Sequence, residues 1–307
     1  MEAANRRRPQ RKINGIFLLD KPVGISSNGA LQQVKRAFGA RKAGHTGNLD
    51  VLATGLLPIC FGEATKVCAF LLDADKRYIA DIKLGEVTET GDSEGEVIRR
   101  VERFSVDIEA ATRVAANFTG EIEQVPPMYS ALKQDGQRLY KLARQGIEVE
   151  RKPRKIVIRS LSVTGLHEGI LSIDVSCSKG TYIRTLAEDI GDALGCGAHV
   201  KSLRRTEAGP FSIEAALSVS QVHDIADGVD SEAMLDEKLL PLDRALINFP
   251  DIELSEEMAF SITRGQAVRI ADAPVEGFVR LYRPKREFIG VGAVLEDGRI
   301  APRRMMA

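Results

Sequence analysis

The sequence predicts an α+β fold with a mixed, mostly antiparallel sheet, followed by a small β-rich module at the C-terminal end. The length of 307 residues suggests about two domains. Because 44% of the residues are hydrophobic, the chain can form a sizeable core. Strand and helix patterns alternate without the regular strand–helix–strand spacing of a doubly wound fold. After Pro250 the pattern changes to short strands in quick succession.

The N-terminal elements begin after a basic segment, residues 1–12, which we expect to be a disordered tail. Gly15–Leu19 has the pattern of a strand. A short helix follows, with Ser27 or Asn28 as its N-cap. Tyr78–Leu84 alternates apolar and polar side chains and predicts a second strand.

The middle of the chain mixes helices with an irregular segment. Val106–Phe118 has a helical pattern, with Ser105 as the expected N-cap. Gln124–Tyr129 contains two adjacent prolines, which lack amide donors and exclude regular structure. Gln137–Arg144 predicts a short helix that is closed by Gly146.

Two strands and a helix follow, over Lys155–Val163, Leu171–Cys177 and Thr181–Leu194. The C-terminal module has one helix, Ser255–Thr263, and Asp297-Gly298 predicts a hairpin near its end. Its expected strands are Val268–Ile270, Phe278–Tyr282, Phe288–Val294 and Arg299–Ala301.

Charge and cysteine usage narrow the function classes. Lys and Arg together number 43, as do Asp and Glu, so the net charge does not predict a nucleic-acid partner. The simplest interpretation of basic clusters such as Arg204–Arg205 is solvated surface. A net charge of zero can nevertheless conceal a positively charged face. The four cysteines lack the spacing of a zinc or redox motif, which predicts reduced thiols in a cytoplasmic protein. No apolar run approaches about 18 residues, the length needed to cross a membrane.

Gly44–Lys66 contains the candidate reactive group, Asp50. Gly47 and Gly55 allow the backbone there to approach a ligand closely, and apolar neighbours hold it in place. Asp50 can therefore serve as a nucleophile or a general base. The alternative is a turn aspartate that caps a short helix beginning near Leu52, which is the commoner role for such a residue.

His45, Tyr78 and Arg184 each have a functional and a structural interpretation. His45 can act as a base, stack on a nucleobase or be a structural histidine, and no Cys or carboxylate lies at metal spacing from it. Tyr78 is either a half-buried core aromatic or a ring that stacks under a flipped base. Arg184 is either a surface partner of Glu188, four residues on, or a buried partner of Asp50.

Several motifs, in order along nearly the whole chain, resemble the TruB type of tRNA pseudouridine synthase. The motifs are Gly15–Pro22 (GIFLLDKP), Gly44–Gly55, Lys76-Arg77-Tyr78, Gln124–Lys133 (QVPPMYSALK) and Cys177–Asp189 (CSKGTYIRTLAED). The resemblance implies a catalytic domain over 13–246, with a mobile thumb inserted at about 124–154. It also implies a PUA-like RNA-binding domain over 247–307.

The same resemblance implies roles for the site residues. Asp50 is the catalytic carboxylate, which a salt bridge with Arg184 keeps ionised, and in a dry pocket this pair would lower the pKa of Asp50. Tyr78 stacks on the target base and accepts a proton, and His45 fills the space that the uridine leaves. Leu203 packs against the site. Further RNA contacts are expected from Lys21, Lys179, Arg204, Arg144 and Arg154.

The implied reaction is the isomerisation of a flipped-out uridine to pseudouridine in the T-loop of tRNA, at position 55. The carboxylate acts either at C6 of the ring or at the sugar, and the sequence leaves both routes open. The resemblance implies a stand-alone monomer that needs no cofactor, metal or protein partner. Asn48 and Val51 depart from the family, which usually has a small residue and Pro there, so we expect a less preorganised loop.

Two other functions remain open. The first is a tRNA-binding or tRNA-folding factor, acting either alongside catalysis or instead of it. The second is a guide-RNA-dependent pseudouridine synthase, which works with partner proteins. The long thumb suits stand-alone RNA recognition and therefore speaks against the second alternative.

Overall fold

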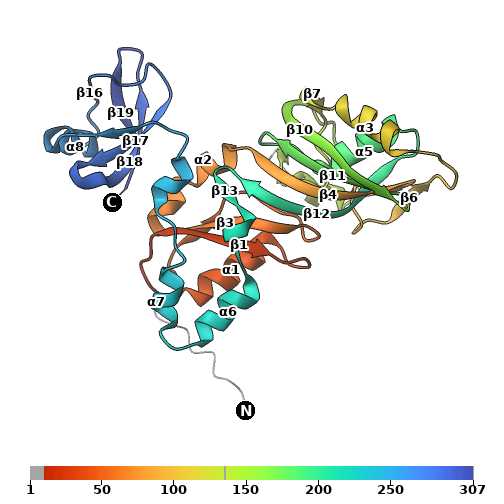
Figure 1. Ribbon diagram of the computed structural model, residues 1–307, viewed down its shortest axis with the longest axis horizontal. Helices are drawn as coiled ribbons and strands as arrows, with labels where there is room; N and C mark the ends of the chain where they lie inside the picture. The colour runs from red at the N-terminus through yellow and green to blue at the C-terminus, as the bar shows by residue number, and fades with distance from the viewer. Residues whose placement is uncertain (1–9, 135, 307) are drawn as a thin grey trace.

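The computed structural model describes residues 10–134 and 136–306, and within them a ten-stranded sheet forms the body of the chain (Figure 1). The strand order is β14-β1-β3-β12-β4-β11-β10-β7, with β2 beside β3 and β13 beside β12. Neighbouring strands are antiparallel except β1–β14 and β3–β12, which confirms the predicted mixed, mostly antiparallel sheet. The strands are β1 (Gly15–Lys21), β2 (Ala43–His45), β3 (Thr54–Phe61), β4 (Lys76–Leu84), β7 (Gly120–Gln124), β10 (Arg154–His167), β11 (Ile170–Cys177), β12 (Ala198–Ala208), β13 (Phe211–Ser212) and β14 (Leu217–Ser218).

Helices lie near both ends of this sheet (Figure 1). They are α1 (Ser27–Ala37), α2 (Cys68–Asp73), α3 (Ile108–Ala116), α5 (Ile183–Ala193), α6 (Val219–Asp227) and α7 (Ser231–Asp236). α6 contacts both α1 and α7 in a group beside β1, whereas α5 packs on β12 and α3 packs on β10. The long strands β4 and β12 connect these two ends, so loops from distant parts of the chain can meet between them.

The core forms because alternate residues of the central strands are apolar. In β11 the buried side chains are Leu171, Ile173, Val175 and Cys177, which alternate along the strand. On the facing side of α5 they are Ile183, Leu186, Ala187 and Ile190, in the same hydrophobic cluster. Burial of each large aliphatic side chain contributes about 1.5–3 kcal/mol, so the sheet is a firm support for the polar loops above it.

A second sheet, five-stranded within the described residues, forms the C-terminal module. Its order is β15-β17-β18-β19-β16, and α8 (Glu256–Thr263) packs on it. The predicted hairpin at Asp297-Gly298 is confirmed, since β18 pairs with β19. Phe70 of α2 packs edge-on against Phe249 and Phe278, with ring centroids 5.4 Å and 5.3 Å away, which joins the module to the body. The strands are β15 (Asp251–Glu253), β16 (Val268–Arg269), β17 (Phe278–Arg283), β18 (Glu287–Val294) and β19 (Arg299–Met305).

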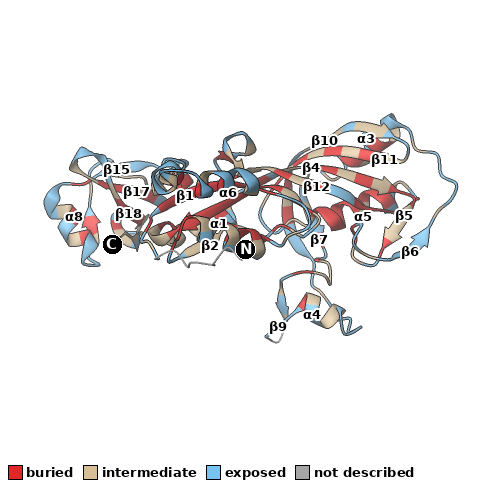
Figure 2. Ribbon diagram, turned by 90° about the horizontal axis from the view of Figure 1, so that it is seen from below, coloured by how far each residue is buried: buried red, intermediate tan, exposed pale blue. Residues whose placement is uncertain are grey.

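The predicted thumb leaves the body as an extension between β7 and β10 (Figure 2). It contains a small hairpin, β8 (Lys133–Gln134) with β9 (Gln137–Arg138), and the short helix α4 (Leu139–Ala143). Residues 125–129 form no helix or strand, as the two prolines predicted, whereas Gln124, which the prediction included, ends β7. A second hairpin, β5 (Glu86–Thr88) with β6 (Val97–Arg100), follows β4.

Two helix caps lie one or two positions away from the prediction. Ser26 caps α1, where Ser27 or Asn28 was expected, and its side chain accepts a main-chain amide hydrogen bond at 3.0 Å. Asp107 caps α3, where Ser105 was expected. Because Ser, Asn and Asp all accept this bond, residue type alone did not distinguish neighbouring positions.

Three other parts of the chain differ from what was predicted. The helix expected from Gln137 begins at Leu139, because the two residues before it pair with β8. Residues 10–12 of the expected tail are placed: Arg11 forms ion pairs with Glu232, at 3.2 Å, and with Asp236. Residues 1–9 lie outside the described part. β12 was not predicted, although it lies in the centre of the sheet, because its charged residues hide the alternation.

Candidate active site

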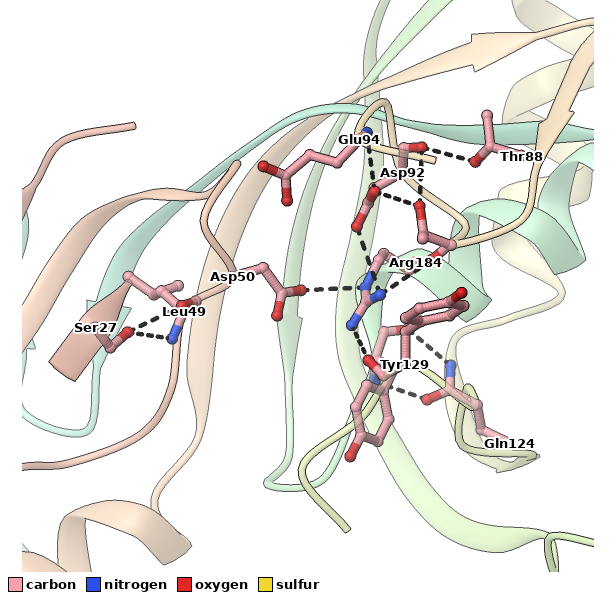
Figure 3. Close-up of polar contacts among 11 residues, drawn as sticks. Ser27, Leu49, Asp50, Thr88, Asp92, Glu94, Gln124, Tyr129 and Arg184 are labelled. Atoms are coloured by element: carbon pink, nitrogen blue, oxygen red, sulfur yellow. Dashed lines mark hydrogen bonds and ion pairs between the residues drawn. The ribbon is translucent and has the colours of Figure 1, made fainter. Parts of the chain in front are cut away.

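Asp50 lies in the loop between β2 and β3. The start of α1 holds this loop, because Ser27 Oγ accepts from the amide of Leu49 at 2.7 Å and donates to its carbonyl at 2.9 Å (Figure 3). A strand follows the loop, so the alternative in which Asp50 caps a helix near Leu52 is wrong. Asp50 is therefore carried by a short loop whose two ends are strands of the central sheet.

Lys21, an expected RNA contact, is fully buried beside this loop. Its ammonium donates to the carbonyls of Pro22 at 2.9 Å and Ile25 at 2.7 Å. Burial lowers the pKa of Lys21 to about 8, although the neighbouring Asp50 carboxylate acts in the opposite direction. The amide of Gly24 donates to the carbonyl of Val51 at 2.9 Å, so the turn after β1 restrains the residue that follows Asp50.

Arg184 of α5 contacts Asp50, with Nε 3.1 Å from Oδ2 (Figure 3). The Arg184 side chain is 7% exposed and that of Asp50 is 38% exposed. Arg184 also donates to the carbonyls of Thr90 at 3.0 Å and Tyr129 at 2.8 Å. Its Nη1 lies 3.5 Å from Asp92 Oδ2. Arg184 is thus a buried residue that joins three separate loops. It is not a surface partner of Glu188 on the next turn of α5.

Asp92 was not singled out from the sequence, because it lies in an acidic stretch typical of solvated surface. Its side chain is 4% exposed, accepts from Thr90 Oγ1 at 2.6 Å and accepts from the amide of Glu94 at 3.1 Å. These bonds close the turn between β5 and β6 and direct the carboxylate at Arg184 (Figure 3). The spacing of Thr and Asp two residues apart, which favours side-chain bonds within a turn, was the available signal.

The pKa of Asp50 is raised, which contradicts the expectation that its ion pair would lower it. Burial is the largest cause, and the Asp92 carboxylate adds to it. Arg184 and Lys21 act in the opposite direction without overcoming burial. The ion pair therefore fixes where the carboxylate points, while the surrounding protein makes its ionisation harder than in water.

Arg205 of β12 lies under the loop and was wrongly grouped with surface basic residues. It is 1% exposed, its Nε donates to the carbonyl of Leu56 at 2.7 Å, and its Nη2 donates to the carbonyl of Gly47 at 3.3 Å. Its main chain pairs with Gly55 on one side and Tyr78 on the other. Burial raises the pKa of Tyr78, and Arg205 partly opposes this. Arg205 thus connects both ends of the loop to the strand that carries Tyr78.

His45 and Leu203 lie on the strands next to the loop. His45 ends β2 and pairs with Ile59 of β3. Burial and the charge of Arg205 lower the pKa of His45, which favours the neutral imidazole. Leu203 is 9% exposed and belongs to the hydrophobic core of the sheet, two residues before Arg205 on β12.

The remaining basic residues of the prediction lie nearer the surface. Arg204 is held by Asp20, with Nη2 2.7 Å from Oδ2. Lys179, which precedes α5, is held by Asp73 at 2.9 Å. Both basic side chains are more than two-fifths exposed, so their ion pairs are open to solvent.

Two arginines belong to the thumb. Arg154 is exposed at the start of β10, where the thumb returns to the body. Arg144 follows α4, and its guanidinium lies 5.7 Å from the centre of the Tyr140 ring. These four basic residues thus fall into two groups, with Arg204 and Lys179 on the body and Arg144 and Arg154 on the thumb.

In the described part of the chain, no group of three or more His, Cys, Asp or Glu side chains is arranged to hold a metal ion. Among the helices within residues 10–134 and 136–306, none has both the length and the apolar character required to cross a membrane.

Three family models match successive parts of the chain. Residues 35–183 match "TruB family pseudouridylate synthase (N terminal domain)". Residues 184–247 match "tRNA pseudouridylate synthase B C-terminal domain", and residues 250–306 match "Pseudouridine synthase II TruB, C-terminal". The chain is 54% identical over 301 residues to tRNA pseudouridine synthase B of Nitrosococcus oceani, with 98% of this chain and 97% of that protein covered. The protein of the same name from Pseudomonas fluorescens is 52% identical over 302 residues, with 98% of each chain covered.

Solved structures show the same architecture. A chain in "Crystal Structure of a Cbf5-Nop10-Gar1 Complex" has a TM-score of 0.73 and 26% identity, covering 95% of this chain and 84% of that chain. A chain in "Structure of H/ACA RNP bound to a substrate RNA containing 2'-deoxyuridine" has a TM-score of 0.71 and 23% identity, covering 95% and 85%. These similarities confirm the predicted α+β fold with its β-rich C-terminal module.

Proposed function

Since the chain belongs to the TruB family of pseudouridine synthases and isomerises uridine in tRNA, we propose that its target is the T-loop uridine at position 55. We further propose that Asp50 is the catalytic carboxylate. The observation that carries this assignment is the ion pair between the half-buried Asp50 and the buried Arg184, at 3.1 Å. A carboxylate that is fixed on one side and open on the other can meet a nucleoside in a defined direction.

The reaction needs little beyond this carboxylate. The N1–C1′ bond breaks, the uracil turns, C5 joins C1′, the proton on C5 then leaves, and N1 takes up a proton from water. The product has the same atoms as the substrate, so no oxidant or second substrate is required. Ionised Asp50 starts the reaction by adding to C6 of the ring or by assisting at the sugar, and Arg184 keeps the carboxylate in place during the rearrangement.

The target base must first leave its stack, which costs a few kcal/mol. We propose that Tyr78 stacks on the flipped base and that the neutral His45 imidazole fills the space left in the RNA, with Leu203 packing against the site. Burial favours the protonated hydroxyl of Tyr78, whereas Arg205 favours the phenolate. In this proposal Tyr78 therefore depends on Arg205 to act as a proton acceptor.

The surface arginines and lysine support a path for the RNA backbone. Arg144 and Arg154 lie on the thumb, and Arg204 and Lys179 lie on the body. The last two can exchange a carboxylate for a phosphate at little cost, because exposed ion pairs contribute only about 0–1 kcal/mol. Such contacts release counterions and make binding dependent on salt.

We infer that the chain acts alone, as a cytoplasmic monomer. Its relatives named tRNA pseudouridine synthase B match 98% of the chain, whereas the similar Cbf5 structure, at 26% identity, is a complex with Nop10 and Gar1. In this proposal the catalytic domain, residues 13–246, and the PUA-like domain, residues 247–307, bind one tRNA together.

Tritium release from a T-arm hairpin labelled with 5-³H-uridine tests the proposal, because C5 loses its hydrogen only when it joins C1′. The purified chain should release tritium without added protein or guide RNA, and Asp50→Asn should not. The matched control is Asp224→Asn, which changes an exposed carboxylate of α6 and should retain the parent rate. A hairpin with cytidine at position 55 and label at its other uridines should release none.

Other outcomes would replace the proposal. Release only after addition of a guide RNA and partner proteins would identify a guide-dependent synthase. Binding of the hairpin without release would identify a tRNA-binding or tRNA-folding factor. Release that persists in Asp50→Asn would show that another group performs the reaction.

A further inference from the structure

The root of the thumb is in direct contact with the arginine that holds Asp50. The carbonyl of Tyr129 accepts from Nη2 of Arg184 at 2.8 Å, while Nε of the same guanidinium contacts Asp50 (Figure 3). Tyr129 lies in the irregular segment that follows β7. One side chain therefore connects the thumb to the candidate catalytic carboxylate.

The side chain of Tyr129 is anchored to a second element. Its hydroxyl donates to Oε1 of Glu89 at 2.7 Å, and this bond raises the pKa of Tyr129, so the hydroxyl stays a donor. Glu89 adjoins Thr90, whose carbonyl also accepts from Arg184, at 3.0 Å. The contacts form a closed ring from Glu89 and Thr90 to Arg184, then to Tyr129 and back to Glu89.

Other bonds fix the same root. The Gln124 side chain accepts from the amide of Tyr182 at 2.8 Å and donates to its carbonyl at 3.1 Å, just before α5 begins (Figure 3). Nη1 of Arg151, in the segment that leads back from the thumb to β10, donates to the carbonyl of Pro126 at 3.1 Å. Both sides of the root are thus tied down, and Tyr129 is the point at which it meets Arg184.

We propose that Tyr129 is a positioning residue, which makes the alignment of Asp50 depend on the seating of the thumb. The Tyr129–Glu89 hydrogen bond holds the Tyr129 carbonyl against Arg184, and Arg184 in turn holds Asp50. This inference rests on the proposed function, in which the thumb contacts RNA. Substrate that settles on the thumb thereby stabilises the arrangement needed for reaction, and an empty or misplaced thumb weakens it.

The physical reason is competition among the acceptors of one guanidinium. Charge-assisted hydrogen bonds are strong and directional, and Arg184 divides its donors among two carbonyls and two carboxylates. If the Tyr129 carbonyl moves away, the guanidinium turns toward the Thr90 carbonyl and Asp92, and away from Asp50. The nearby Asp92 is fixed by its own turn, so the less restrained Asp50 is the contact that changes.

Tyr129→Phe and Glu89→Gln test the proposal without disturbing the core. Each change removes or weakens the same solvent-exposed hydrogen bond and leaves the thumb arginines in place. Single-turnover tritium release should show a fall in the rate at saturating RNA of about tenfold, with a KM within about twofold of the parent. The double variant should be no slower than the slower single variant, because both act on one contact.

The matched control is Glu121→Gln. Glu121 is an exposed carboxylate of β7, on the strand that leads into the thumb, and accepts from Lys155 at 2.8 Å. It has the same kind of surface bond but no connection to Arg184, so its rate should equal that of the parent. An equal fall in the control, or a rise in KM at unchanged rate in Tyr129→Phe, would overturn the proposal.

A second readout needs neither RNA nor activity. Carbon-13 NMR of the aspartate carboxyl groups gives the pKa of Asp50, whose resonance is the one missing in Asp50→Asn. Tyr129→Phe and Glu89→Gln should both move this titration to higher pH, and Glu121→Gln should not. An unchanged Asp50 titration in all three would overturn the inference, whereas absence of tritium release by the parent would overturn the proposed function alone.

Discussion

Ser27 and Leu49 exchange two hydrogen bonds, in which the serine hydroxyl accepts from the leucine amide at 2.7 Å and donates to the leucine carbonyl at 2.9 Å. Both residues are buried, so water cannot replace either bond. The pair ties the first residue of α1 to the residue before Asp50 (Figure 3). Arg184 therefore restrains the carboxylate itself, while α1 restrains the backbone that carries it.

Ser27→Ala should lower both stability and rate. It leaves a buried amide and a buried carbonyl of Leu49 unpaired, which costs about 1–3 kcal/mol. Ser26→Ala is the control, because it removes the exposed N-cap of the same helix at a cost of about 1 kcal/mol without touching the loop. Urea unfolding should show a loss in both variants, and tritium release should fall in Ser27→Ala alone. An equal fall in rate would show that Ser27 acts only through α1.

Gly55→Ala should be far more damaging than a glycine substitution elsewhere. Gly55 has φ +102°, and a Cβ there would lie 2.2 Å from the carbonyl oxygen of Arg205, so β3 and β12 could not stay paired. Gly195 has φ +77° with no described heavy atom within 4 Å of its Cβ position. Gly195→Ala should cost about 1–2 kcal/mol from backbone strain, and Gly55→Ala about 1–3 kcal/mol more. Similar free energies of unfolding would contradict the close contact.

The raised pKa of Asp50 has consequences for pH dependence. In the proposed function the ionised carboxylate reacts, so the rate should rise with pH through a value above about 3.9, the pKa of aspartate in water. The free energy of unfolding changes with pH in the opposite direction to the rate, because the folded state holds this proton more tightly than the unfolded state. Stability from Asp50 is fully present below the unfolded pKa and is lost as pH rises through the folded pKa.

Asp50→Asn has no carboxyl group to ionise at this position, so it does not lose this stability as pH rises. Its free energy of unfolding should therefore improve relative to the parent as pH rises from about 4 to about 7. Urea unfolding of both proteins at each pH measures the difference. A difference that stays constant over this range would show that burial does not raise the Asp50 pKa.

Salt dependence should separate phosphate contacts from other basic residues. Lys179→Ala and Arg154→Ala should each reduce the slope of log affinity against log salt by about 1, as expected for one lost phosphate contact. Lys238→Ala, an exposed lysine after α7 and outside the proposed RNA path, should leave the slope unchanged. Fluorescence anisotropy of a labelled T-arm hairpin measures all three, and an unchanged slope in Lys179→Ala would remove it from the path.

The regular parts of the fold could be predicted because they face a core on one side. β4, β11 and the C-terminal hairpin show alternation or a turn dipeptide that depends only on local sequence. β12 could not be predicted in the same way, since Arg205 places a charged side chain where the pattern requires an apolar one. Its burial is possible only because carbonyls of a different strand and loop accept its hydrogen bonds.

The candidate active site could be predicted only in part. Asp50, Arg184, Tyr78 and His45 lie in recognisable motifs, and the structure brings Asp50 and Arg184 into contact. The contribution of Tyr129 to Arg184 comes from its main-chain carbonyl, which every residue possesses, so no residue pattern could reveal it. The direction of the Asp50 pKa was also wrong, because it depends on how much protein surrounds the pair.

The parallel pairing of β3 with β12 sets the order in which the site can be completed during synthesis. β3 finds its partner β1 early, but its other edge stays open until Ala198–Ala208 has emerged from the ribosome. A nascent chain that ends before β12 has a free strand edge, able to associate with another chain, and lacks the arginine that spans the loop. Closure of such a distant pair is slow compared with a hairpin. Catalytic activity should therefore appear late and in a single step, when β12 pairs with β3 and completes the sheet.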